Sequence, residues 1–155
     1  LRMIDDGSVE EQRFPPLLVY GATIDYLNNR WPKKWHLLHD GLYERCVEAM
    51  AALLGERGLR MLVVLPPEEA GDDKYRLGLH HTRERTRFFN LLWRQAARAN
   101  PEHLWVLQLD HLIESDGEMA DVTHYHAGLL QKIAGQIDCW IEAVALGGGA
   151  QAEAG

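Results

Sequence analysis

Met61-Leu-Val-Val-Leu-Pro-Pro67 decides the fold class of this 155-residue chain. Its apolar residues end abruptly at two prolines, as in a short strand that is buried on both faces of a parallel sheet. Two other runs have the same character: Leu17-Leu-Val-Tyr20, which is closed by Gly21, and Leu104-Trp-Val-Leu-Gln-Leu109. The sequence therefore predicts three short, buried strands.

Helical periodicity fills the intervals after these strands, over about 36–57, 82–99 and 129–144. Gly58 stands where a glycine ends a helix, and Thr82 can cap the second helix, which Asn100-Pro101 ends. Three strand-helix units predict right-handed crossovers and a three-layer α/β/α domain with a parallel sheet. The residues expected to face the core are Leu38, Leu42, Cys46, Met50, Leu53 and Leu54, then Phe88, Leu91, Leu92, Ala96 and Ala99, then Leu129, Leu130, Ile133, Ile137, Ile141 and Val144.

The domain is expected to span residues 1–146, and residues 147–155, which contribute nothing to a core, are expected to be a disordered tail. The strand at 17–20 is apolar on both faces, as in a central strand. The 16 residues before it are too few for another strand and its crossover. Because an uncovered apolar edge favours association, we expect an upstream segment or a second chain to complete the sheet.

Composition excludes some classes of function. A formal net charge of -7 argues against nucleic acid as a partner. No apolar run approaches the ~18 residues of a membrane span, and no signal peptide opens the chain. The composition does not assign the protein to a cellular compartment. Cys46 and Cys139 lie in helical patterns and are expected to be small buried hydrophobes, with a disulfide between them as the alternative.

Asp121-Val-Thr-His124 is the strongest candidate site, because it follows the third strand, and open α/β proteins bind ligands at the carboxyl ends of their strands. A histidine oriented by a carboxylate can activate a hydroxyl nucleophile. The simpler alternative is that Asp121 or Thr123 caps the last helix while His124 lies on the surface. A weaker alternative is a metal site of Asp121, His124 and His126, with His80-His81 converging on it. Neither a metal nor a cofactor is part of the favoured prediction.

Other polar residues allow two interpretations each. Asp110 and Asp25 follow predicted strands and are expected to cap loops, with substrate positioning as the alternative. Arg83, Arg85 and Arg87 are expected to form a solvated helix face, with an anion site near the helix start as the alternative.

Four segments, in this order, resemble the carboxyl-terminal portion of the SGNH hydrolases, a flavodoxin-like superfamily of esterases and acyltransferases. They are Leu17–Asp25, Met61–Pro67, Arg83–Trp93 with Asn90, and Asp121–Gly128, and together they span about residues 17–145. The resemblance implies a flavodoxin-like fold and serine-based acyl transfer on a carbohydrate or small-molecule ester. It also implies His124 as the general base and Asp121 as the residue that orients it. Gly21 and Asp25 align by position with the block that contacts substrate.

The family's serine lies in a Gly-Asp-Ser block that has no clear counterpart here. The only serines are Ser8, in Asp5-Asp-Gly-Ser8, which does not follow a strand, and Ser115, which lies in a turn-like loop. The oxyanion-hole glycine of the second block and the Asn of the third are also missing. The sequence therefore predicts an esterase or acyltransferase part whose nucleophile lies outside this chain. The alternative is a binding or assembly module that kept the fold without the chemistry.

Overall fold

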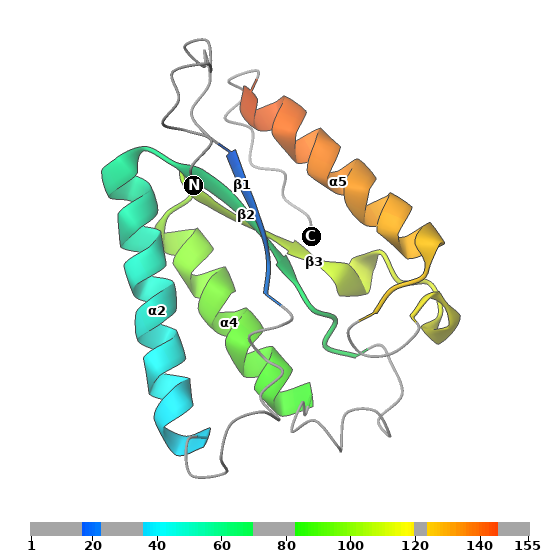
Figure 1. Ribbon diagram of the computed structural model, residues 1–155, viewed down its shortest axis with the longest axis horizontal. Coiled ribbons are helices and arrows are strands. Elements are labelled where there is room, and N and C mark those ends of the chain that lie inside the picture. Colours follow the sequence, from blue (N-terminus) through cyan, green and yellow to red (C-terminus); the bar gives the residue numbers. More distant parts are fainter. Residues whose placement is uncertain (1–16, 23–35, 70–82, 120–123, 146–155) are drawn as a thin grey trace, which may run out of the picture.

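The computed structural model describes residues 17–22, 36–69, 83–119 and 124–145 (Figure 1). Three parallel strands form one sheet in the order β1-β2-β3. The strands are β1 (Leu17–Gly21), β2 (Arg60–Leu65) and β3 (Leu104–Gln108). The helices are α2 (His36–Arg57), α4 (Arg83–Ala99) and α5 (Ala127–Ala145), and the short 3-10 turns η2 (Leu109–His111) and η3 (Asp116–Glu118) lie between β3 and α5. The predicted α/β class with a parallel sheet is confirmed.

The ends of the elements follow local chemistry. Gly58 ends α2 with a φ of 61°, a left-handed conformation that glycine adopts without steric cost. The backbone N–H of Leu59 then donates to the carbonyl of Leu54, at 2.9 Å, and closes the helix end. The third strand is one residue shorter than predicted, because Leu109 already begins η2.

The larger core lies between the sheet and the layer of α2 and α4. Met61, Val63 and Leu65 alternate along β2 and point to this side, where Phe89 and Trp93 of α4 meet them. The indole N–H of Trp93 donates to the hydroxyl of Tyr43, at 2.8 Å, so that α2 and α4 also share a polar contact.

A second, smaller core lies on the opposite face, under α5 (Figure 1). Val64 and Leu107 point to this side and pack beside Leu129 and Ile133 of α5. Farther along the helix, the rings of Trp105 and Trp140 lie 5.8 Å apart at 62°. The guanidinium of Arg60 donates to the carbonyl of Val144, at 3.1 Å. Helices therefore pack on both faces of the sheet, as predicted.

Several residues assigned to the core from the sequence are exposed instead, and those predictions were wrong. The exposed set is Leu42, Cys46, Met50, Leu53, Phe88, Leu91, Ala99, Leu130 and Ile141. In α2 the packed side is shifted by about one residue, because Val47, Ala51 and Leu54 are the buried positions. The apolar arc of α2 is wider than the surface that covers it, so periodicity alone could not select the packed side.

The prediction that both cysteines are buried was also wrong. Cys46 and Cys139 are exposed and free, so no disulfide joins them. They lie on helices that cover opposite faces of the sheet.

β1 is less covered than the sequence suggested. Leu18 is 40% exposed and Val19 is 47% exposed. Within the described residues, β1 pairs with β2 alone and has no second neighbour. Among those residues, no helix is long and apolar enough to cross a membrane.

Candidate functional site

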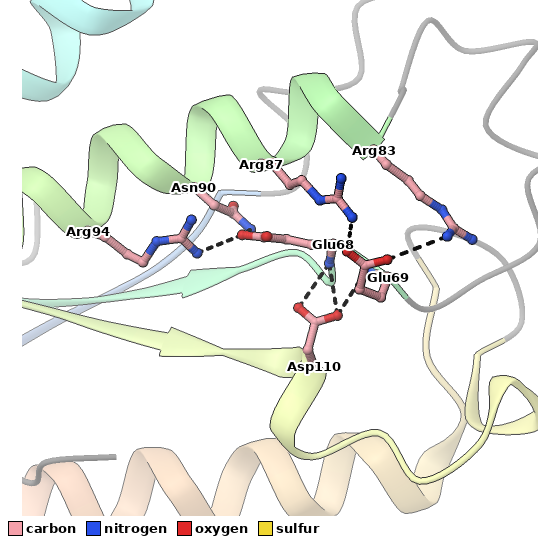
Figure 2. A network of polar contacts seen from close by, with 7 residues as sticks. All are labelled: Glu68, Glu69, Arg83, Arg87, Asn90, Arg94 and Asp110. Atoms are coloured by element: carbon pink, nitrogen blue, oxygen red, sulfur yellow. Dashed lines mark hydrogen bonds and ion pairs between the residues drawn. The ribbon is translucent and has the colours of Figure 1, made fainter. Parts of the chain in front are cut away.

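The carboxyl ends of β2 and β3 are tied together by Asp110 (Figure 2). Asp110 lies in η2, immediately after β3, and its carboxylate accepts hydrogen bonds from the segment that follows β2. The N–H of Glu68 donates to both oxygens, at 3.0 and 2.9 Å, and the N–H of Glu69 donates to one of them, at 3.0 Å. The loop-capping interpretation of Asp110 is confirmed, and the capped loop shapes this rim of the sheet.

Asn90 fixes the same loop from α4 (Figure 2). Its side chain is 1% exposed, and its amide nitrogen donates to the carbonyl of Pro66 and to the carboxylate of Glu68, both at 3.0 Å. Arg94, one turn further along α4, pairs with the same Glu68 carboxylate at 2.6 Å. The Pro-Pro segment and the Asn of α4, which looked like separate motifs in the sequence, are therefore two sides of one contact.

The arginines at the start of α4 contact the neighbouring carboxylate. Glu69 pairs with Arg83, at 3.5 Å, and with Arg87. The seven residues of this rim network include three carboxylates and three guanidinium groups, so their formal charges cancel (Figure 2). Because the carboxylate of Glu69 already pairs with Arg83 and Arg87, these two arginines are disfavoured as a binding site for another anion.

His124 lies between β3 and α5, next to a point where two parts of the connecting segment pair with each other. Tyr125 forms an isolated antiparallel bridge with Met119, and the N–H of His126 donates to the carbonyl of Glu118, at 2.8 Å. His124 is exposed next to this bridge. Asp121, its predicted partner, lies outside the described residues, so the pairing of the two stays a prediction.

Lys132 of α5 anchors the segment that precedes the Met119–Tyr125 bridge. Its ammonium donates to the carbonyl of Leu112 at 3.2 Å, to the carboxylate of Glu114 at 2.9 Å and to that of Glu118 at 2.8 Å. The bond from Lys132 is the main cause that lowers the pKa of Glu118, and the bond to Glu118 is the main cause that raises the pKa of Lys132. Lys132 thus fixes the segment on the amino-terminal side of the predicted catalytic pair.

Replacing Lys132 with Met is expected to lower the free energy of unfolding at neutral pH. A carboxyl whose folded-state pKa is lowered stabilises the fold above its ordinary pKa of 4.5 and loses this effect as the pH falls through the folded value. A lysine whose pKa is raised contributes below 10.5 and loses its effect as the pH rises through the folded value. The difference from the parent should therefore be largest between these limits and shrink outside them.

Urea unfolding across this pH range measures the effect of Lys132→Met. The neighbouring exposed Gln131 provides a control, because Gln131→Met adds a similar side chain without removing these bonds. A pH-independent difference for Lys132→Met would contradict the assigned pairing.

The remaining predicted site residues do not gather in the described structure. Gly21 ends β1, is exposed, and has open space where a side chain would begin. Ser115 is exposed before η3, and its hydroxyl makes no capping bond there. Asp25 and Ser8 lie outside the described residues.

Among the described residues, no three metal-ligating side chains cluster, so they add no support to the alternative of a metal site. His126 is exposed. The other ligands of this alternative, Asp121 and His80-His81, lie outside the described part of the chain.

Protein-family models, curated proteins and solved structures give no match to this chain. The residues that build the rim are therefore assigned from their contacts alone. Sequence reasoning missed Glu68 and Lys132, although one signal was present: Glu68 comes directly after the prolines that end β2. Nothing in the sequence singled out Lys132, because its partners lie 14 to 20 positions earlier in a loop.

Proposed function

We propose that this chain is part of a serine esterase or O-acyltransferase of the SGNH type, acting on a carbohydrate or small-molecule ester. The observation that carries the proposal is the place of His124. It is an exposed imidazole between the carboxyl end of β3 and the start of α5, three residues after Asp121. The nucleophilic serine comes from polypeptide outside residues 1–155.

In the proposed reaction, His124 accepts the proton of the serine hydroxyl while the serine oxygen attacks the ester carbonyl. His124 then gives this proton to the leaving alkoxide, and an acyl-serine remains. Water or an acceptor hydroxyl attacks the acyl group, again losing its proton to His124, and the serine is released with a proton. Asp121 orients the imidazole and stabilises its protonated form.

The anchored surroundings of His124 support this role. A general base must be held in place, since small displacements of a catalytic group reduce the rate strongly. Lys132 fixes the preceding segment through Glu118, and the Met119–Tyr125 bridge fixes the chain beside His124. Asp110 fixes the neighbouring loop at the end of β2.

Labelling of the full-length gene product with a fluorophosphonate tests the proposal, because this probe reacts with an activated serine. We expect His124→Ala to slow labelling by about 10²–10⁴-fold, the usual contribution of a general base. His126→Ala is the matched control, since His126 is also exposed and lies only two positions away. Labelling that is equally fast in His124→Ala would overturn the assignment.

A non-catalytic binding or assembly module is the second candidate. One observation favours it: Ser8 and Ser115 are the only serines of the chain, and Ser115 is exposed before η3 with no assigned base. A full-length product that is folded and yet never labelled would support this candidate and exclude the esterase.

A further inference from the structure

A groove between α2 and α4 opens on the outer side of the helix layer that covers the larger core. It has a volume of about 370 Å³, and the side chains that shape it include Glu44, Glu48, Ala51 and Ala52 of α2 and Ala96 and Ala99 of α4. Glu44, Glu48, Ala52 and Ala99 are exposed, so the groove faces away from the sheet. The four alanines leave a space that an apolar side chain of another molecule can fill.

The groove has two chemically different ends. α2 and α4 run in the same direction, because each connects one strand of a parallel sheet to the next (Figure 1). Along that direction, the carboxylates of Glu44 and Glu48 come first, and the small side chains of Ala52 and Ala99 come last. Glu44 and Ala51 are seven residues apart. The acidic end and the alanine end are therefore separated by about two helical turns, or about 10 Å.

The acidic end of the groove has no cation to match it in the part of the chain that the structure describes. Glu44 and Glu48 stand about one turn apart on α2, a spacing at which like charges repel. Neither forms an ion pair among the described residues. Arg83, Arg87 and Arg94 of α4 turn to the other flank of that helix, where they bind the carboxylates of the rim network. A cation from another molecule would therefore relieve the repulsion.

A ridge on the outer side of α4 borders this groove. It consists of Leu91, Gln95 and Arg98, which are all exposed and follow one another at helical spacings of four and three residues. Gln95 also lines the groove. Leu91 is 40% exposed, and Arg98 forms no ion pair among the residues that the structure describes. Along this ridge the apolar group comes first and the charge comes second, again seven residues, or about two turns, apart.

We propose that two copies of this chain form a symmetric dimer, in which the ridge of each copy lies in the groove of the other. The order of the groups is reversed between groove and ridge, so the two match when α4 of one copy runs antiparallel to α4 of the other. Leu91 of each copy then meets the alanine end of the other groove, and Arg98 meets Glu44 and Glu48. A two-fold axis that passes near Gln95, perpendicular to the helices, produces both sets of contacts at once, as in an isologous interface.

Two separate effects favour this association. Covering the exposed part of Leu91 removes apolar surface from water. Placing Arg98 beside Glu44 and Glu48 neutralises one charge of a repelling pair, and a guanidinium can bind carboxylates through two nitrogens. The interface lies on the layer of α2 and α4, whereas His124 leads into α5 on the opposite face of the sheet. The inference therefore does not depend on acyl transfer.

Sedimentation of the full-length gene product over a range of concentrations tests the dimer. We expect a monomer–dimer equilibrium, and Arg98→Glu should raise its dissociation constant at least about tenfold, because three carboxylates would then face one another. A variant with both Glu44→Arg and Glu48→Arg should be weakened in the same way. Mixing the two variants should restore association, because each reversed charge in one copy then faces a reversed charge in the other. Restored association also shows that both variants are folded.

Matched substitutions on α5 control for general effects of charge and polarity. Leu91→Asp should raise the dissociation constant at least about tenfold, since it places a charge in an apolar contact. Leu130→Asp should leave the constant unchanged, although Leu130 is 52% exposed, because it lies on the other face of the sheet. Glu142→Arg is the control for the glutamate variant, since Glu142 is exposed on α5.

Three results would overturn the proposal. A full-length product that stays monomeric at every concentration would mean that no second copy occupies the groove. A dimer that dissociates in Leu130→Asp and persists in Leu91→Asp would place the interface on α5. Mixed charge variants that fail to associate would show that Arg98 does not meet the two glutamates.

Discussion

Phe89→Ala is expected to lower the free energy of unfolding by about 3–5 kcal/mol, the usual cost of removing a buried aromatic ring. Phe89 is 1% exposed, and its ring lies 4.5 Å from that of Tyr43, so it joins α4 to α2 above the sheet. Truncation to alanine removes this contact and leaves a cavity. α2, α4 and the sheet could fill this cavity only by moving toward one another. Urea denaturation followed by circular dichroism measures the loss.

The adjacent ring supplies the control for this experiment. Phe88 has the same side chain on the same helix turn but is 40% exposed. Phe88→Ala should cost no more than about 1 kcal/mol, as for most surface substitutions. Equal losses for the two variants would show that the packed side of α4 has been assigned incorrectly.

Asn90→Asp is expected to cost about 3–5 kcal/mol, although it changes almost no volume, because it places an uncompensated charge in a buried position. The amide nitrogen of Asn90 is a donor to the carbonyl of Pro66 and the carboxylate of Glu68. In an aspartate, the oxygen that replaces this nitrogen would instead face two acceptors, the carbonyl of Pro66 and the carboxylate of Glu68. Thermal unfolding at neutral pH measures the loss.

Two comparisons identify the cause of that loss. Asn90→Leu removes the two hydrogen bonds without adding a charge, so it should cost less, about 1–3 kcal/mol. The Asn90→Asp defect alone should decrease as the pH falls, because a protonated carboxyl regains a donor. A pH-independent defect in Asn90→Asp would contradict the assigned contacts.

The fold was largely predictable because its signals are local. Short apolar runs that end at Gly21 or at Pro66 define strands, and the left-handed Gly58 marks a helix end. Burial was less predictable. Leu53 and Leu54 are adjacent and identical in type, yet only Leu54 is buried, because the position of the neighbouring α4 decides which one is covered.

The loop-capping role of Asp110 was predictable from the sequence, but the partners of its carboxylate were not. The rim was expected to carry Asp110, and this carboxylate does bind the loop after β2. Its partners are backbone N–H groups, which no residue type in the sequence can reveal. Lys132 likewise reaches a carbonyl and two carboxylates across a loop, and such pairings depend on tertiary structure alone.

The unequal sizes of the two cores have a consequence for motion. α5 rests on a small cluster that includes Leu129 and Ile133, whereas α2 and α4 share the larger one. Regions with fewer buried contacts open at lower free energy than the whole domain. We therefore expect the amide hydrogens of α5 to exchange with deuterium before those of α4, and the separation of Trp140 from Trp105 to change the indole fluorescence at the same step. Opening of α5 would also break the bonds that Lys132 makes to the segment between β3 and His124, so this segment should lose its order at the same step.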